Sequence, residues 1–213
     1  MSLFIDIMNM EVLMKNKTIT RKISQGMYIL TTDGGGCVVD AVSQVSAGEN
    51  PLIAVAVMKK NYTNELMKKN NKFAISVLGM KSNPELINVY GTKSMRDYDK
   101  FANSRIMNIE GINIPSESIG YMICEKIDEI DNETHTLFIG KLIEADKFNE
   151  DVPMTYNYYQ EHKEELMKVV TKKGKTAWIC TVCNYVVYEE ELPVDFVCPM
   201  CGAPRELFKK KED

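Results

Sequence analysis

Short apolar runs separated by turn residues fill roughly the first 160 positions of the chain. Runs rich in β-branched, aliphatic and aromatic residues, bounded by Gly, Pro, Asn or Asp, are typical of β-strands. The pattern predicts strands at 27–32, 37–46, 51–58, 72–79, 119–130 and 134–145. We expect "DGGG" (33–36) to form a turn, and "DNE" (131–133) to join the last two strands as a hairpin.

Two short helices are predicted between these strands. One covers 61–70, with Thr63 or Asn64 as its N-cap, and the other covers 82–91 behind Asn83. Strands dominate and do not alternate with long helices, so the pattern favours a mainly β, antiparallel barrel over a doubly wound parallel sheet. The glycines of "DGGG" lack the G-x-G-x-x-G spacing of a dinucleotide-binding turn.

The pattern changes after residue 160. "QEHKEELMKVVTKKGKTA" (160–177) predicts a helix that decays into a stretch rich in Lys and Gly. We therefore divide the chain into a β-rich domain at 1–165, a linker at 166–176 and a C-terminal module at 177–213.

The C-terminal module contains four of the six cysteines, arranged as two C-x-x-C pairs. The pairs are Cys180 with Cys183 and Cys198 with Cys201. Two such turns facing each other form a tetrahedral four-sulfur site, which suits zinc or iron, and the spacing alone does not choose the metal. Asn184 and Gly202 follow the two pairs, and both residue types tolerate the positive φ of a tight knuckle.

Composition and charge narrow the possible partners. The net charge is −4, and residues 178–213 carry seven carboxylates against four basic side chains. This favours docking to a basic protein partner over binding nucleic acid. The N-terminal stretch lacks a basic signal-peptide region, and the apolar run at 51–58 is too short to span a bilayer, so we expect a cytoplasmic protein.

The residues around the cysteines resemble rubredoxin. The resemblance rests on "WICTVCNY" (178–185) and "LPVDFVCPMCGA" (192–203), and the short stretch between the pairs is similar to the rubredoxin tail of rubrerythrins. It implies one iron held by the four cysteines and cycling between ferric and ferrous. Asn184 stands where rubredoxins usually have glycine, and the shortened loop implies a more exposed iron.

Upstream, "GMYILTT", "DAVSQVSAGENPLIAVAVMKKNYTNELM", "GTKSMRDYDKF" and "THTLFIGKL" resemble the flavin reductase-like, FMN-binding split-barrel family. This resemblance runs from about Ile23 to Tyr159. The whole chain then looks like the fusions of a flavin reductase-like domain with a rubredoxin domain that are called high-molecular-weight rubredoxins.

The resemblance implies a homodimer with FMN near the subunit interface. The flavin ring and ribityl chain would lie along Asp40, Ala41, Val42, Ser43 and Gln44. The phosphate would lie among Ser46, Lys60, Asn61, Thr63, Lys93, Ser94 and Arg96. Short hydroxyls, cations and a helix N-terminus are the groups that a phosphate prefers. Asp40 stands where the resemblance leads us to expect Asn.

His135 is the candidate catalytic residue, because the family often carries a His near the nicotinamide site and His changes charge near neutral pH. The alternative is a strand histidine that faces solvent. Cys37 and Cys124 lie in apolar strands and are interpreted as buried thiols.

These features together predict an oxidoreductase. NAD(P)H would reduce FMN, which would pass electrons to the iron and on to a redox protein such as a flavodiiron protein. Two alternatives remain open: an FMN and iron carrier without its own NAD(P)H activity, and a flavin reductase whose tail is a structural zinc ribbon used for interaction.

Overall fold

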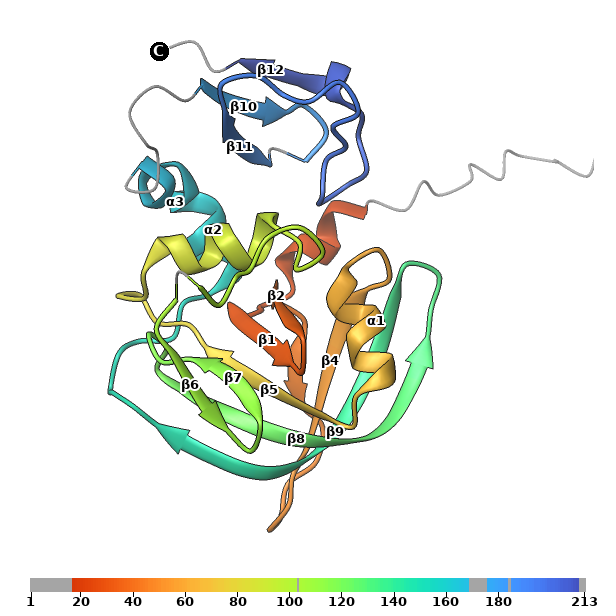
Figure 1. Ribbon diagram of the computed structural model, residues 1–213, viewed down its shortest axis with the longest axis vertical. Helices are drawn as coiled ribbons and strands as arrows, with labels where there is room; N and C mark the ends of the chain where they lie inside the picture. The colour runs from red at the N-terminus through yellow and green to blue at the C-terminus, as the bar shows by residue number, and fades with distance from the viewer. Residues whose placement is uncertain (1–16, 103, 169–175, 184, 211–213) are drawn as a thin grey trace, which may run out of the picture.

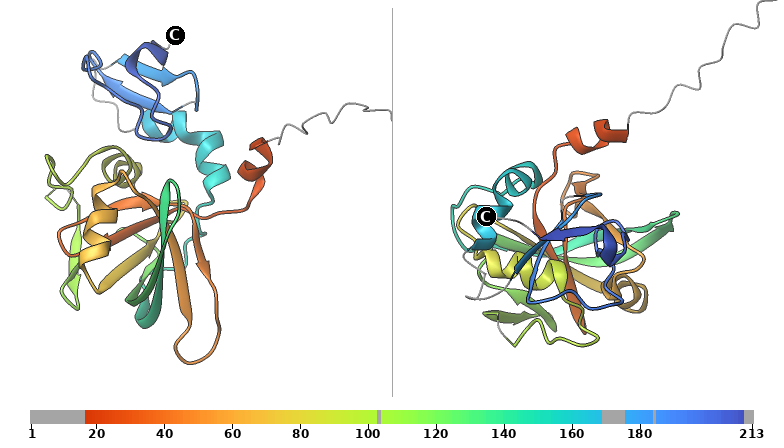
Figure 2. Two further views of the ribbon diagram at one scale, coloured as in Figure 1. Left: turned by 90° about the vertical axis from the view of Figure 1, so that its right-hand side faces the viewer. Right: turned by 90° about the horizontal axis from the view of Figure 1, so that it is seen from above.

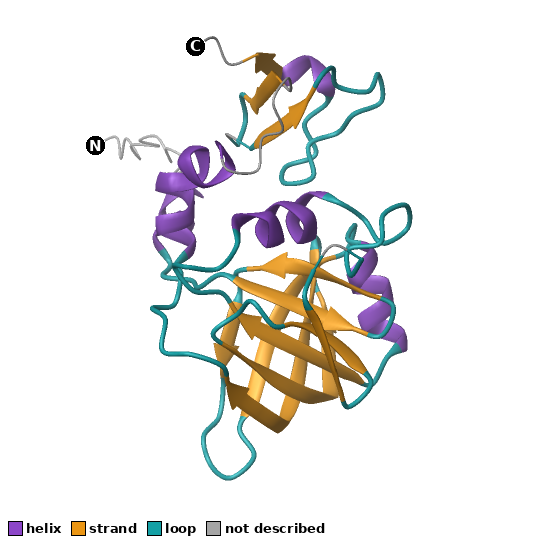
Figure 3. Cartoon of the chain, turned by 60° about the vertical axis from the view of Figure 1, so that its left-hand side comes forward, coloured by secondary structure: helices purple, strands orange, loops and turns teal. Residues whose placement is uncertain are grey.

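The computed structural model describes residues 17–102, 104–168, 176–183 and 185–210. Its main feature is a seven-stranded antiparallel sheet in the order β2-β1-β5-β8-β9-β4-β3, which curls into a half-barrel (Figures 1 and 3). The strands are β1 (Tyr28–Thr32), β2 (Gly35–Val39), β3 (Val42–Gln44), β4 (Leu52–Met58), β5 (Lys72–Val77), β8 (Gly120–Asp131) and β9 (His135–Lys147). The mainly β, split-barrel prediction is confirmed.

The single strand predicted at 37–46 is wrong. The chain turns at Asp40, whose carbonyl accepts a hydrogen bond from Val42 N at 3.0 Å, and β2 and β3 lie on opposite edges of the sheet. The turn before β2 is also shorter than predicted, because Gly36 is part of the strand. A Cβ at Gly36 would lie 2.6 Å from the Leu30 carbonyl oxygen, so this close strand pairing requires glycine.

The predicted helices form, with different ends. α1 (Tyr62–Lys69) has Asn61 as its N-cap rather than Thr63 or Asn64. Both predicted caps are buried, and Asn64 Nδ2 donates to the Val57 carbonyl at 3.0 Å, so these side chains tie the helix to the sheet. α2 (Pro84–Thr92) begins as predicted, with Asn83 Oδ1 accepting from Glu85 N at 3.0 Å.

Three further elements complete the first domain. They are the 3-10 helix η1 (Lys17–Lys22), a hairpin of β6 (Ile106–Ile109) and β7 (Ile112–Pro115), and α3 (Tyr156–Lys168). The hairpin was not predicted, because its strands are only four residues long and its turn places the non-glycine residue Glu110 at φ 53°. None of the helices in the described part of the chain is long and apolar enough to cross a membrane.

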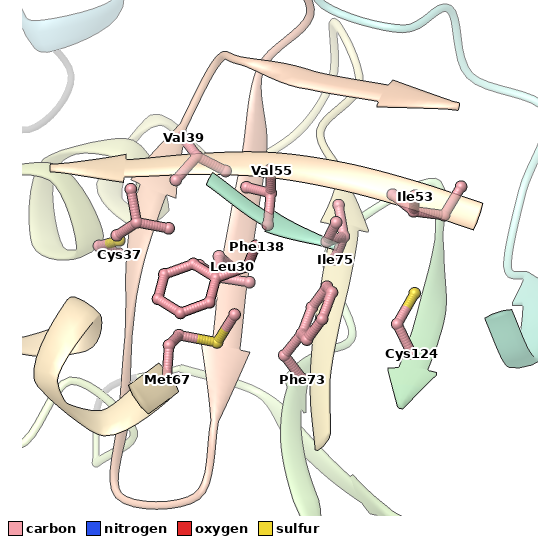
Figure 4. Packing of buried hydrophobic residues seen from close by; sticks show 11 residues of the cluster. Leu30, Cys37, Val39, Ile53, Val55, Met67, Phe73, Ile75, Cys124 and Phe138 are labelled. Carbon is pink, nitrogen blue, oxygen red and sulfur yellow. The ribbon is translucent and has the colours of Figure 1, made fainter. Parts of the chain in front are cut away.

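The core lies inside the curled sheet, where Phe138, Leu30 and Val55 gather with the side chains of β5 (Figure 4). Cys37 and Cys124 belong to this cluster, which confirms that both are buried. Burial raises the pKa of Cys37 and that of Cys124, the latter to about 12.

The C-terminal module is a three-stranded sheet in the order β11-β10-β12. Its elements are β10 (Thr176–Cys180), β11 (Val186–Glu189), the 3-10 helix η2 (Arg205–Leu207) and β12 (Phe208–Lys210). Residues 166–168 of the predicted linker continue α3, Thr176 opens β10, and 169–175 lie outside the described residues. The module lies over α2 and beside α3 (Figures 1 and 2).

Candidate metal centre and flavin site

The four predicted metal ligands come together. Their sulfur atoms all lie within 4.8 Å of one another, with Cys180 and Cys201 3.7 Å apart and Cys183 and Cys198 3.5 Å apart. A tetrahedral ion with bonds of about 2.3 Å requires sulfur–sulfur separations of about 3.8 Å. The constellation therefore fits a single four-coordinate metal ion.

Backbone N–H groups point at the sulfurs. The sulfur of Cys180 accepts hydrogen bonds from the N–H groups of Cys183 and Val182, and that of Cys198 from Cys201 and Met200. Burial raises the pKa of Cys180, but these bonds lower it and the net shift is downward. For Cys198 burial prevails and the pKa is raised, so a bound cation is needed to hold that sulfur as a thiolate at neutral pH.

The backbone of the knuckles explains how so short a segment reaches this geometry. Gly202 has φ 75°, as predicted, and its N–H donates to the Cys198 carbonyl at 2.9 Å. Asn184, predicted to do the same after the first pair, lies outside the described residues. Cys180 and Cys198 are fully buried whereas Cys201 is exposed, so one ligand faces solvent.

Part of the predicted phosphate site also assembles. The segment Lys60–Thr63, which we call the anion loop, follows β4 and includes the first two residues of α1. Thr63 is buried and bonds to Cys37. Arg96, from the segment after α2, lies 4.4 Å from the Tyr62 ring centroid and pairs with Glu65. Ser94 Oγ accepts from Arg96 N at 3.2 Å, so two segments distant in sequence present a cation and hydroxyls together.

Two of the predicted phosphate residues lie elsewhere. Ser46 Oγ accepts from Leu52 N at 2.9 Å, at the end of β4 opposite the anion loop. Seven residues of strand span about 20 Å, so Ser46 is not beside Lys60 in this chain. Lys93 caps the C-terminus of α2, and its Nζ lies 3.5 Å from Glu189 Oε1 of the module.

The residues predicted to line the flavin ring form a strip along β4. Ala41 accepts from Ala56 N at 3.0 Å, and Val42 pairs with Val55. Asp40, Ala41 and Val42 are half-buried, whereas Ser43 and Gln44 are exposed. The strip starts beside the anion-loop end of β4 and runs away from it.

His135 lies at the same end of the sheet. It is the first residue of β9, pairs with Met58 and is half-buried, with Nδ1 2.8 Å from Thr134 Oγ1. Lys59 N donates to the Thr134 carbonyl at 2.9 Å, which ties this strand end to the anion loop. His135 is therefore a half-buried strand histidine at the anion-loop end of the sheet.

Lys100 is a buried cation that the sequence analysis missed. The residue is 2% exposed, and its Nζ donates to the carbonyls of Gly36 at 2.8 Å and Tyr90 at 3.2 Å. Burial lowers the pKa of Lys100 to about 8, while the charge of nearby Cys37 acts in the opposite direction. The ammonium therefore lies between β2 and α2, near Cys37.

This pKa predicts a pH dependence of stability. The unfolded chain has the ordinary pKa of 10.5, so between about 8 and 10.5 it binds more protons than the folded chain, and stability rises with pH. In a Lys100→Met variant this contribution is absent. Urea unfolding at both ends of the window should show the wild type gaining about 3 kcal/mol relative to the variant. A difference that stays constant or falls with pH would show that burial does not perturb Lys100.

Comparison with known proteins places both parts of the chain. The family profile described as flavin reductase like domain matches residues 20–167, and the profile described as rubrerythrin, rubredoxin-like domain matches residues 178–209. The chain belongs to the flavin reductase-like family. It carries a rubredoxin-like domain at its C-terminal end, as its four-cysteine knuckle indicates.

Two relatives extend this assignment. The chain is 32% identical to the high molecular weight rubredoxin of Moorella thermoacetica, covering 88% of this chain and 96% of that protein. It is 29% identical to the ferric-chelate reductase (NAD(P)H) of Archaeoglobus fulgidus, covering 76% and 93%. These relatives support electron transfer as the general function.

Solved structures confirm the fold of the first domain. The Streptomyces globisporus NADH:FAD oxidoreductase SgcE6 matches with a TM-score of 0.60 at 18% identity, over 65% of this chain and 85% of that one. Flavin reductase HpaC complexed with NADP+ matches with a TM-score of 0.58 at 23% identity, over 66% and 90%. The flavin reductase fold implies a flavin, and the rubredoxin-like domain with its four cysteines implies iron.

Proposed function

We propose that this protein passes electrons from NAD(P)H through FMN to an iron held by its four cysteines, and on to a separate redox protein. The observation that carries the proposal is a contact between the two parts. Lys60 Nζ of the anion loop lies 3.5 Å from the carbonyl oxygen of Cys198. A cofactor held at that loop would share a border with the metal centre.

The residues of the first domain would bind and orient the flavin. Lys60, Thr63 and Arg96 would bind the phosphate, and the strip from Asp40 to Gln44 would support the rest of the cofactor. When bound, the flavin supplies two-electron exchange with a nicotinamide and one-electron exchange with a metal. His135 would lie at the edge of this site as the candidate catalytic residue, with Nδ1 2.8 Å from Thr134 Oγ1.

Further parts of the proposal follow from the family resemblance. The protein would act as a homodimer in the cytoplasm, where cysteines stay reduced and able to bind metal. A flavodiiron protein is the proposed acceptor, because the acidic module fits a basic docking surface.

Anaerobic titration of the iron-loaded, FMN-loaded protein with NADH and with NADPH tests the proposed reaction. We expect loss of both the ferric–thiolate bands and the flavin absorbance, because electrons that enter at the flavin pass to the iron. Bleaching with neither nucleotide, but iron reduction once the flavin is reduced chemically, would identify an electron carrier instead. A flavin that bleaches without any change at the iron would contradict the proposal.

The phosphate site can be tested separately through Arg96→Gln. A charge-assisted hydrogen bond contributes about 1.5–3 kcal/mol, so FMN affinity should fall roughly 10- to 100-fold while riboflavin affinity stays unchanged. Flavin fluorescence quenching measures both affinities. Arg105→Gln, which removes the same charge from an exposed position, is the control. An equal loss of riboflavin affinity would show that Arg96 does not bind the phosphate.

A further inference from the structure

The C-terminal module is seated on the first domain through specific contacts. Tyr188 packs against a buried cluster that includes Met167 of α3 and residues of α2. Tyr185 is hydrogen-bonded to Thr92, and burial raises its pKa. Together with the Lys93–Glu189 ion pair, these contacts define one docked position, with the module over the C-terminal end of α2.

In this position two cations of the first domain face the four-cysteine centre. Lys60 Nζ lies 3.5 Å from the Cys198 carbonyl oxygen. Lys163 of α3 is half-buried; burial lowers its pKa, and the nearby thiolates of Cys183, Cys180 and Cys198 oppose that shift. The module itself supplies backbone N–H groups to the sulfurs, so these lysines add charge that the isolated module lacks.

We propose that docking of the module depends on the redox state of its iron, with Lys60 and Lys163 as the residues that sense the charge. This rests on the iron of the proposed function. Four thiolates around ferric iron carry a net charge of −1, and around ferrous iron −2. Reduction adds one electron, supplied by the reduced flavin, and breaks no bond to cysteine. The additional negative charge strengthens attraction to both lysines.

Thermodynamic linkage relates the strength of docking to the reduction potential of the iron. If docking is tighter in the ferrous state, the iron has a higher reduction potential when docked than when released. The docked centre therefore accepts an electron readily, and release lowers its potential, which favours donation to an external partner. A tenfold preference for docking in the ferrous state corresponds to a shift of about 59 mV for one electron.

The test compares the full-length, iron-loaded wild type with Lys60→Gln/Lys163→Gln. The reduction potential is measured by spectroelectrochemical titration of the ferric–thiolate absorbance with chemical mediators. We expect the potential of the variant to be lower, equivalent to about a tenfold change in the ferrous-to-ferric ratio, or about 59 mV. The control is Lys69→Gln/Lys141→Gln, which removes two exposed lysines that have no contact with the module among the described residues.

Two further measurements keep the test independent of how well the variant loads iron. Raising the salt from about 0.01 M to about 1 M shortens the Debye length from about 30 Å to about 3 Å. This should lower the wild-type potential toward that of the variant. Small-angle X-ray scattering should show the ferrous wild type as more compact than the ferric form. Equal potentials in all three proteins would overturn the proposal, and so would equal compactness of the ferric and ferrous wild type.

Because mediators reduce the iron directly, the result does not depend on electron transfer from the flavin. If NADH reduces the iron but the three potentials agree, the docking proposal alone fails. If the potentials and the compactness both change as expected but no electron passes from flavin to iron, the proposed function fails and redox-dependent docking stands.

Discussion

Replacement of Cys198 by alanine is expected to abolish metal binding and unfold the C-terminal module, while the first domain stays folded. The module has a buried core of only five residues, including two of the ligands, Cys180 and Cys198. So small a core relies on its metal, and for structural zinc in zinc-finger peptides the binding energy that serves as folding energy is about 10–16 kcal/mol. The substitution also leaves the partner sulfurs without the fourth ligand.

Elemental analysis for iron and the ferric–thiolate absorbance measure the loss, and bound flavin reports on the first domain. Cys124→Ala is the matched control, because it removes a fully buried cysteine from the sheet core and leaves all four ligands in place. We expect it to retain one iron per chain. Full iron content in Cys198→Ala, or loss of iron in Cys124→Ala, would contradict assignment of the centre to the four paired cysteines.

The metal centre could be predicted from the sequence because its geometry is local. Each C-x-x-C turn places its two sulfurs by its own backbone, and the positive φ of Gly202 follows from the residue type. Only the approach of the two turns to each other depends on residues distant in sequence. Binding of one tetrahedral ion by all four sulfurs requires that approach. Residue type and spacing were therefore sufficient to predict that these four sulfurs come together.

Features that depend on which distant segments pair with one another could not be predicted from the sequence in this way. One apolar run, 37–46, supplies both edge strands of the sheet, because a turn at Asp40 moves the chain from one edge to the other. The pattern of apolar residues on either side of Asp40 does not change at this turn, so the pattern does not indicate where one strand ends and the next begins. Lys100 likewise has no sequence feature that distinguishes it from a surface lysine. It is buried because its ammonium donates hydrogen bonds to the carbonyls of Gly36 and Tyr90.

The proposed flavin site falls between these cases. Lys60, Asn61 and Thr63 are neighbours in sequence, so their proximity was predictable. Arg96 was predicted with them from the family resemblance, and the structure places it beside Tyr62 and Glu65. Ser46 is separated from that group by the length of β4, which the order of residues did not reveal. Docking of Tyr185 and Tyr188 was equally hidden, because aromatic residues in a small module also serve its own core.

Phe138→Ala is expected to give the largest loss of stability in the first domain. Phe138 is fully buried on β9, paired with Val55 of β4 and Glu129 of β8, at the centre of the core cluster (Figure 4). Truncating a buried Phe leaves a cavity and costs about 3–5 kcal/mol. Domains of this size are stable by about 5–15 kcal/mol, so a large share of the stability is lost.

The position of the single tryptophan allows the effect to be localised. Trp178 lies on β10, so its fluorescence follows unfolding of the module, whereas far-UV circular dichroism follows mainly the large sheet. In urea, the dichroism transition of Phe138→Ala should have its midpoint at a lower urea concentration than that of the wild type. The free energy of unfolding extrapolated to water should be lower by about 3–5 kcal/mol. The tryptophan transition should follow only as far as docking through Tyr188 couples the two parts.

Two controls separate cavity formation from a general effect of mutation. Phe138→Leu keeps most of the buried volume and should cost about 1.5 kcal/mol or less. Ile130→Ala, on the exposed end of β8, should change the stability by no more than about 0.5 kcal/mol. If Phe138→Ala matched Ile130→Ala, the residue would not be part of a close-packed core. A tryptophan transition that moved as far as the dichroism would instead show that sheet and module unfold as one cooperative unit.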